Sequence, residues 1–145
     1  MTLKAVPDGY HTVTPYLTVD DPDALINFLR QAFGAEVKYM MKDDQGNVRH
    51  AEVQVGDSML MTGKARDEWR PRPGMFYIYV PDCDSVYQKA IAAGGNSIQA
   101  LTNHPYGDRS GAVRDSQGND WWIASHVEDV SHEELERRMK AGAHS

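Results

Sequence analysis

The sequence has a single cysteine, Cys83, among 145 residues. One cysteine excludes an intramolecular disulfide and a cysteine-based zinc site, so the fold must depend on packing, and we expect Cys83 to be an unreactive structural thiol. No apolar run approaches the roughly 18 residues that a membrane span needs, and residues 1–8 lack the basic and apolar blocks of a secretory signal. We therefore expect a soluble, cytoplasmic protein with no membrane partner.

Basic residues are also scarce. The chain has 15 Lys and Arg against 21 Asp and Glu, a formal net charge of −6. This balance argues against a nucleic-acid partner, because phosphate-backbone binding depends on clustered Lys and Arg. The one basic cluster is Lys64, Arg66, Arg70 and Arg72, and it is interleaved with Asp67, Glu68, Pro71 and Pro73. That mixture favours a solvated linker over a binding patch.

The chain instead contains a repeated order of one strand, one helix and three strands. In the first half, residues 11–19 are β-branched and aromatic, Asp21-Pro22 begins a helix that Gly34 ends, and strands are predicted at residues 36–42, 48–55 and 58–62. In the second half, a strand at 75–80 precedes a helix capped by Asp82, and strands follow at 96–102, 108–114 and 121–125. Two such halves, each too small to bury its own sheet, predict a tandem α+β domain.

The predicted boundaries follow from this order. One βαβββ module spans residues 11–63, a linker spans 64–74, and a second module spans 75–126. Ser131 to Glu134 forms a capping box, which predicts a short C-terminal helix at 131–140. Since 145 residues supply one substantial core, the whole chain is expected to be a single domain.

Several segments carry a resemblance to a known family. They are Thr18 to Phe28, Ala32 to Glu36, His50 to Glu52, Gly56 to Ser58, Tyr106 to Gly111, Asp115 to Gly118 and Glu128 to Ser131. In order and spacing these segments resemble the PhnB-like branch of the vicinal-oxygen-chelate superfamily, the glyoxalase, bleomycin-resistance and extradiol-dioxygenase proteins. The resemblance covers residues 11–139. It implies two modules whose curved sheets form an open barrel around a cavity.

The resemblance does not settle function, since the superfamily includes metal-dependent lyases, isomerases and dioxygenases as well as metal-free binding proteins. In the metal-dependent members, ligands on the first and last strands of both modules hold a divalent ion. The corresponding positions here are Thr14, Met61 or Thr62, Met75 and Trp122, none a good ligand for a divalent ion. We predict that the usual metal site is absent and that no cofactor is required.

A displaced metal site is the alternative. His50 and Glu52 are two residues apart on one predicted strand, so they share a face, and His104 and His126 could lie near them. A polar pair lining a cavity explains the spacing better than a metal centre does. In either case His50 and Glu52 are the candidate catalytic residues, because a paired imidazole and carboxylate tune each other's proton affinity.

Aromatic residues gather on or near the strands that should form the cavity, Trp69 and Trp121 among them. The candidate ligand-binding residues are Tyr16, Tyr77, Tyr79, Tyr106, Arg109 and Trp122. Tyr77 and Tyr79 should share a face, whereas Trp121 and Trp122 should lie on opposite faces. Core filling is an equally good explanation of the aromatics. Arg109 either ties its loop to a carboxylate, with Asp108 as one possible partner, or holds an anionic or polar ligand.

Three functions remain open. The first is metal-free binding of a small, possibly aromatic molecule in the cavity between the modules, for which the acidic balance favours a cationic ligand. The second is a lyase, isomerase or dioxygenase of the superfamily type, using a displaced metal or metal-independent acid-base catalysis at His50 and Glu52. The third is action through association. A homodimer is expected under all three.

Overall fold

The structure is a computed structural model in which residues 3–142 are described. The first half contains β1 (Tyr16–Val19), α1 (Pro22–Phe33), β2 (Glu36–Lys42), β3 (Val48–Val55) and β4 (Ser58–Lys64). The second half contains β5 (Met75–Tyr79), α2 (Cys83–Ala92), β6 (Asn96–Asn103), β7 (Asp108–Arg114) and β8 (Asp120–His126), and α3 (His132–Gly142) follows. This is the predicted α+β fold of two βαβββ modules with a C-terminal helix.

The helix α1 begins and ends where its sequence predicts. The Asp21 side chain accepts a hydrogen bond from the backbone N–H of Ala24 at 3.1 Å, and Gly34 ends the helix in the left-handed conformation at φ 67°. The apolar side of α1 is buried, with Leu25 and Leu29 fully inaccessible. Burial of one such leucine contributes about 1.5–3 kcal/mol. The helix is therefore held mainly by the sheet and helix it covers.

Each module forms its own four-stranded sheet. The strand orders are β1-β4-β3-β2 and β5-β8-β7-β6, and the first and last strands of each module run parallel to each other. The first strand is shorter than residues 11–19, the range that composition predicts, because regular pairing starts at Tyr16. Pro15 has no N–H to donate, and only its carbonyl contributes, accepting from the backbone of Met61 at 2.9 Å.

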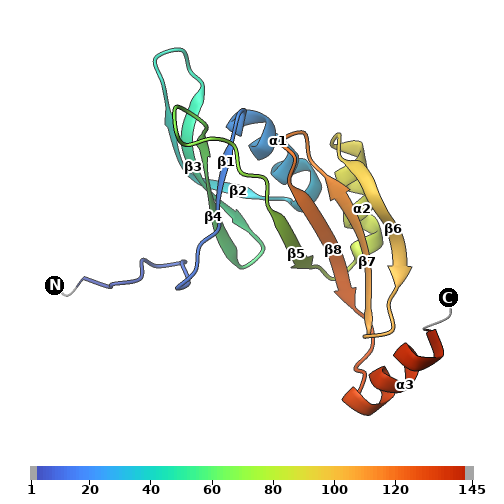
Figure 1. Ribbon diagram of the computed structural model, residues 1–145. Helices are drawn as coiled ribbons and strands as arrows, with labels where there is room; N and C mark the ends of the chain where they lie inside the picture. Colours follow the sequence, from blue (N-terminus) through green and yellow to red (C-terminus); the bar gives the residue numbers. More distant parts are fainter. Residues whose placement is uncertain (1–2, 143–145) are drawn as a thin grey trace.

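The two modules meet through their helices. α1 packs on β3 and β4, α2 packs on β6, β7 and β8, and the two helices pack against each other. One core runs through both modules, with the rings of Phe33 and Trp121 centred 5.3 Å apart. Figure 1 shows the two sheets side by side with α1 between them, and among the described residues no strand pairing joins them into a closed barrel. Each sheet consequently has one face covered by helix and one open face.

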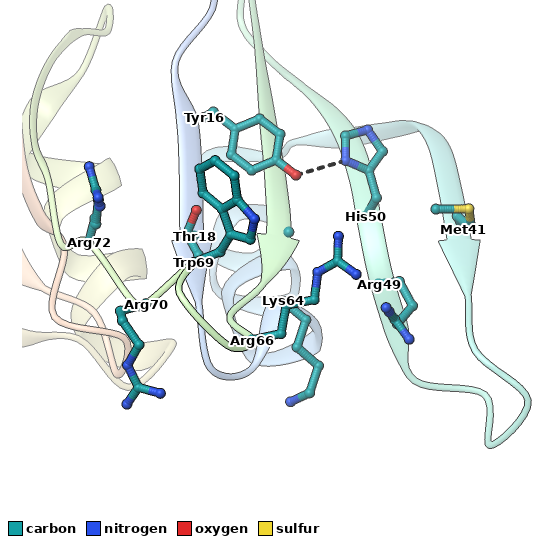
Figure 2. Close-up of a pocket in the computed structure, with 11 residues that line it drawn as sticks. Tyr16, Thr18, Met41, Arg49, His50, Lys64, Arg66, Trp69, Arg70 and Arg72 are labelled. Atoms are coloured by element: carbon teal, nitrogen blue, oxygen red, sulfur yellow. Dashed lines mark hydrogen bonds between the residues drawn. The ribbon is translucent and has the colours of Figure 1, made fainter.

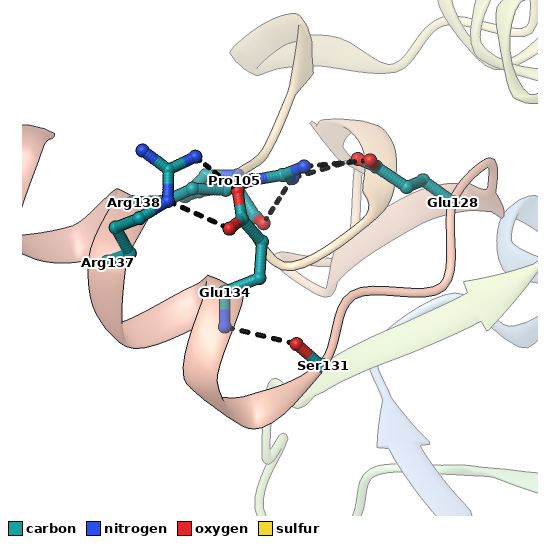
Figure 3. Close-up of polar contacts among 6 residues, drawn as sticks. All are labelled: Pro105, Glu128, Ser131, Glu134, Arg137 and Arg138. Atoms are coloured by element: carbon teal, nitrogen blue, oxygen red, sulfur yellow. Dashed lines mark hydrogen bonds and ion pairs between the residues drawn. The ribbon is translucent and has the colours of Figure 1, made fainter.

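The helix α3 extends beyond the second module (Figure 1) and buries no residue. Ser131 caps it by accepting from the backbone N–H of Glu134 at 3.1 Å. Arg138 attaches it to the rest of the chain, through both carboxylate oxygens of Glu128 at 2.8 Å and the carbonyl of Pro105 at 3.0 Å (Figure 3). Among residues 3–142, no helix is long and apolar enough to cross a membrane.

Candidate functional site

The open face of the first sheet carries most of the chemistry that the sequence predicted for the first module. Strand alternation places Leu17 against α1 and leaves Tyr16 and Thr18 on the open side. By the same alternation His50 and Glu52 lie on the open face of β3. Gly63 on β4 is paired with His50 and lies under the ring of Tyr16, because an added Cβ there would collide with the tyrosine hydroxyl. The glycine thus makes room for the ring.

A cavity of about 610 Å³ lies over this open face. Its floor comes from the first sheet and its wall from the segment that follows β4, which we call the linker (residues 65–74). Figure 2 shows the aromatic rings of Tyr16, Trp69 and His50 around the same space, with basic side chains beside them. The lining residues are Tyr16, Thr18, Met41, Arg49, His50, Gly63, Lys64, Arg66, Trp69, Arg70 and Arg72. We refer to this site as the basic cavity.

The main chain of the linker is hydrogen-bonded to the sheet at two points, while the side chains of Arg66, Trp69 and Arg70 stay exposed, so the linker is attached to the sheet and solvated. The backbone N–H of Ala65 donates to Val19 at 2.8 Å and that of Arg72 donates to Thr18 at 3.1 Å, so the linker continues along β1. Arg66 and Trp69 also exchange two backbone hydrogen bonds, of 2.9 and 2.7 Å, in a tight turn. Directly opposed residues of an antiparallel pair share a face, so this turn holds Arg66 and Trp69 together on the cavity wall.

His50 is the centre of a hydrogen-bonded chain at the cavity floor. Its Nδ1 lies 3.2 Å from the hydroxyl of Tyr16, and its Nε2 lies 3.3 Å from Glu52, both side chains of the His–Glu pair being partly buried. The carboxylate of Glu52 also accepts a hydrogen bond from Tyr10. The imidazole therefore has one nitrogen oriented by a carboxylate and one directed towards a phenol at the cavity, as acid-base chemistry requires.

The open face of the second sheet has a separate polar cluster around Asp108, which we call the Asp108 cluster. Asp108 is 2% exposed and accepts from Tyr77 at 2.7 Å and from Tyr79 at 2.8 Å. Its other oxygen lies 2.9 Å from Nδ1 of His126, whose Nε2 lies 2.7 Å from Asp129. These five side chains form one connected network across β5, β7 and β8.

The network shifts the proton affinities of its members. Burial alone would raise the pKa of Asp108, but hydrogen bonds from His126, Tyr77 and Tyr79 together bring that pKa below its usual value. Asp108 and then Asp129 raise the pKa of His126. Burial, with Tyr106 and Asp108 nearby, raises the pKa of Tyr77 well above its ordinary value, so this phenol stays protonated at physiological pH.

The other predicted ligand-binding residues are not brought to the basic cavity. Arg109 lies on the helix-covered face of the second sheet and forms two hydrogen bonds, of 2.7 and 3.0 Å, to Asp84 on α2. A pairing of Arg109 with Asp108 is therefore wrong, because adjacent strand residues point to opposite faces. Tyr106 stacks on His104, with ring centres 5.1 Å apart. Trp122 shares the open face of Tyr77 and Tyr79, opposite the buried Trp121, as strand alternation predicts.

The residues at the superfamily's metal positions do not fit a divalent ion. Met61, Met75 and Trp122 offer no hard oxygen or imidazole donor, and Thr62 faces α1, where its hydroxyl donates to the Leu17 carbonyl at 2.8 Å. The displaced set is also not assembled. Within the part of the chain that the structure describes, no three His, Cys, Asp or Glu side chains are placed to hold a metal ion. Neither set of side chains therefore supplies the donors that a divalent ion requires.

Comparison with known proteins agrees with the fold. Residues 10–123 match the model of the glyoxalase/bleomycin resistance protein/dioxygenase superfamily. The chain belongs to this superfamily. Two uncharacterized mycobacterial proteins resemble this glyoxalase-superfamily chain, each 27% identical over 140 residues and 89% of it. They are Mb0911c of Mycobacterium bovis, of which 92% is covered, and Rv0887c of Mycobacterium tuberculosis, of which 82% is covered.

Solved structures share the fold of this chain. TioX from Micromonospora sp. ML1 superposes with a TM-score of 0.70 at 24% identity, covering 81% of this chain and 99% of TioX. A PhnB protein from Bacillus cereus gives a TM-score of 0.61 at 18% identity, covering 79% of this chain and 99% of that protein. At these identities the likeness shows the fold alone, and the PhnB neighbour is consistent with the PhnB-like segments of the sequence.

The basic residues of the cavity are what sequence reasoning missed. Arg49 lies on a strand whose neighbours predicted the His50–Glu52 pair, and Arg66, Arg70 and Arg72 were assigned to a solvated linker. Trp69 was the available signal, and the sequence placed it near the cavity strands, but its 60% exposed side chain lies beside the arginines that were assigned to the linker. The linker's acidic residues, Asp67 and Glu68, do not line the cavity.

Proposed function

We propose that the protein binds a small molecule with a flat ring in the basic cavity. The observation that carries the proposal is the cavity itself, whose volume of about 610 Å³ lies within the range of about 300–1,000 Å³ found for ligand pockets. Trp69 on the linker and Tyr16 on the sheet present large ring surfaces to it. Ring stacking on such surfaces tolerates varied ligands but requires planarity. The proposed activity is therefore small-molecule binding, with Tyr16 and Trp69 as ring-contacting residues.

The way the cavity is built supports a preformed site. Gly63 accommodates the ring of Tyr16, and the paired backbone of Arg66 and Trp69 fixes the opposite wall. Side chains held in place before binding lose less conformational freedom when a ligand arrives.

The open faces support a homodimer in which each copy helps to cover the other's cavity. Met75 is 67% exposed and Tyr79 is 64% exposed on the second sheet, and Tyr16 is 54% exposed on the first. Large apolar side chains left exposed on open sheet faces commonly mark an association surface. We propose that the open face of module two in one copy approaches module one of its partner. This pairing would bring Tyr77, Tyr79 and Trp122 of one copy towards Tyr16 and His50 of the other.

Titration with N-phenyl-1-naphthylamine, an uncharged fluorescent two-ring probe, tests the binding function. Saturable binding that Trp69→Ala weakens at least about tenfold, and that Trp69→Phe restores, is expected if the ring contacts the cavity wall. Circular dichroism and thermal unfolding of each variant check that the fold is intact. Affinity that is indifferent to Trp69→Ala in a folded protein would overturn the proposal.

A second candidate function is metal-independent acid-base catalysis at His50. The observation that favours it is the chain from Tyr16 through His50 to Glu52, in which the carboxylate orients the imidazole. His50 would accept a proton from a bound substrate, and Glu52 would stabilise the resulting imidazolium. Glu52 hydrogen-bonds to His50 and Tyr10 and would act as a positioning residue.

Ring opening of 5-nitrobenzisoxazole tests this candidate. A base removes the ring C–H proton, the N–O bond breaks, and a coloured cyanophenolate forms, so a positioned base accelerates the reaction. If His50 is that base, His50→Gln reduces the rate at least about a hundredfold, the lower range of general-base effects. Binding of N-phenyl-1-naphthylamine should remain. Equal rates in the two proteins would exclude His50 as a general base for this probe.

A further inference from the structure

The charge of the basic cavity is opposite to the charge of the chain. The formal net charge is −6, yet the cavity that residues 3–142 form is lined by five cationic side chains and by no Asp or Glu. The cationic residues are Arg49, Lys64, Arg66, Arg70 and Arg72. Charges further away than about 8–10 Å are largely screened at physiological salt. The local lining, and not the whole-chain balance that favours a cationic ligand, therefore determines which ions the cavity attracts.

Among residues 3–142, the four cavity arginines and Arg30 on α1 have no carboxylate partner, whereas the other four arginines have one. Arg109, Arg114, Arg137 and Arg138 each form two-pronged contacts to a carboxylate. By contrast, among the described residues no carboxylate pairs with the side chain of Arg49, Arg66, Arg70 or Arg72. Lys64 donates to the backbone carbonyl of Asp20, at 2.8 Å. Donors that the fold leaves unused remain available for a ligand.

The linker turn separates its own charges in a way that keeps the cavity basic. Arg66 and Trp69 are directly opposed and share the face that lines the cavity, whereas Asp67 and Glu68 at the tip do not line it. Asp67 adopts the left-handed conformation, at φ 46°, that closes such a tight turn. One short turn thus supplies an aromatic surface and a guanidinium side by side, while its carboxylates stay outside.

We infer that the ligand of the basic cavity is an aromatic oxyanion, a planar ring that bears a carboxylate, sulfonate or phosphate group. This inference rests on the proposed binding function and adds the charge of the ligand. The ring packs against Trp69 and Tyr16. The oxyanion is held by Arg66, whose guanidinium points towards the rings in Figure 2 and whose planar group matches two oxygens at once, while Arg49 adds a positive charge at the cavity edge.

Two fluorescent probes with the same rings, one with a sulfonate and one without, show how much the charge of the ligand adds to binding. 8-Anilinonaphthalene-1-sulfonate carries a sulfonate that N-phenyl-1-naphthylamine lacks. We expect the sulfonate probe to bind about tenfold more tightly or better, since hydrogen bonds to charged groups are the stronger kind. Raising the salt from about 50 to about 500 mM should reduce this preference, because salt screens a partly open site.

Two matched arginine substitutions test whether the preference for the sulfonate probe arises in the cavity. Arg66→Gln should weaken the sulfonate probe about tenfold and leave the uncharged probe within about twofold. Arg30→Gln is the control, because Arg30 is exposed on α1, outside the cavity, and its loss changes the net charge equally. Equal weakening by Arg30→Gln and Arg66→Gln would mean that only the overall charge matters, and would overturn the inference.

Displacement of the bound sulfonate probe identifies the oxyanion. Displacement by benzoate or phenyl phosphate supports the inference. The stronger competitor shows whether the cavity prefers a carboxylate or a phosphate. If inorganic phosphate competes as well as phenyl phosphate does, the ring is not recognised and the inference fails. If the uncharged probe binds at the Trp69 wall as tightly as the sulfonate, the binding function stands and the inference fails. If neither probe depends on Trp69, both fail.

Discussion

Gly63 and Tyr16 show how a single residue shapes the cavity floor. We predict that Gly63→Ala weakens ring binding, because the added methyl group meets the Tyr16 hydroxyl and turns the ring away from its position beside His50. Overpacking of this kind costs about 1–3 kcal/mol, although the ring lies at an open face and can move. Titration with N-phenyl-1-naphthylamine should show about fivefold weaker binding if the lower end of that cost falls on the bound state. Unchanged affinity would mean that Tyr16 does not contact the probe.

The Asp108 cluster makes stability depend on pH in a direction that its pKa shifts determine. The pKa of His126 is raised on folding, so its contribution to stability is present below its unfolded pKa and is lost as pH rises through the raised value. The pKa of Asp108 is lowered, so its contribution is present above its unfolded pKa and is lost as pH falls through the lowered value. Between the two unfolded pKa values, about 3.9 and 6.5, both contributions are present.

His126→Gln should therefore destabilise the protein more at about pH 5.5, below the unfolded pKa of the imidazole, than at about pH 9, because the contribution of the charged form is lost as pH rises through the raised folded pKa. Urea unfolding at the two pH values measures the difference. His132→Gln is the control, because His132 pairs with Glu136 on the exposed helix α3, away from the Asp108 cluster. A loss of stability that is the same at both pH values would contradict the ion pair.

For single residues, strand alternation predicted which side chains share a face of a sheet. It did not predict contacts that come from other elements. It placed His50 with Glu52 and Tyr77 with Tyr79 on shared faces, and both expectations are confirmed. It could not choose the partner of Arg109, because Asp84 approaches from α2 across the covered face. A period of two gives the face of a residue and not its neighbours.

Among the elements, α3 is attached to the rest of the chain through the side chain of Arg138. Arg138 is the residue that reaches Glu128 and Pro105, whereas Arg137 contacts Glu134 within the same helix (Figure 3). The two arginines lower the pKa of Glu134 to about 2, so this carboxylate stays charged and paired with them at neutral pH. Because α3 buries no residue, packing cannot replace the anchor.

We predict that Arg138→Ala detaches α3 and leaves the rest of the fold in place. Amide hydrogen exchange should become faster in residues 132–142 and stay unchanged in β7 and β8. Arg137→Ala removes a pair within the helix and should leave exchange at the helix close to wild type. If both substitutions expose α3 equally, loss of the contact to Glu134 that both arginines make explains the change, and the anchor to Glu128 and Pro105 is not needed.

The order of elements was predictable because their signals are local. Asp21 and Gly34 begin and end α1 as predicted, and Asp82 begins α2 as predicted, because each acts on residues within a few positions of itself. The end of α2 differs slightly, since its C-cap is Ala93, just before the expected Gly94 and Gly95. The linker was not predictable in this way. Its position depends on backbone hydrogen bonds to Thr18 and Val19, far earlier in the chain, which no local pattern in charge or proline content reveals.

At the scale of the whole molecule, joining the modules through α1 and α2 leaves both sheets open on their other sides. The superfamily resemblance implied a cavity enclosed by both modules, and within this chain the cavity is built by module one and the linker. Tyr77, Tyr79 and Trp122 on module two do not line it. The predicted ligand-binding residues can therefore act together only if a second copy brings module two to the cavity.

This requirement leads to a test of the proposed homodimer. Met75 is 67% exposed on the open face of module two, so Met75→Arg should fold normally and place a cation where the partner's basic cavity approaches. Desolvation and like-charge repulsion there should weaken association at least about tenfold, a cost of about 1.4 kcal/mol. Sedimentation equilibrium measures the change.

Met139→Arg is the matched control, since Met139 is 55% exposed on α3, away from both open faces. If the two copies complete each other's cavity, Met75→Arg also weakens the binding of N-phenyl-1-naphthylamine in proportion to the loss of dimer, and excess protein restores it. If the wild-type protein sediments as a monomer and still binds the probe through Trp69, module one and the linker suffice for binding. The exposed tyrosines of module two must then serve another contact.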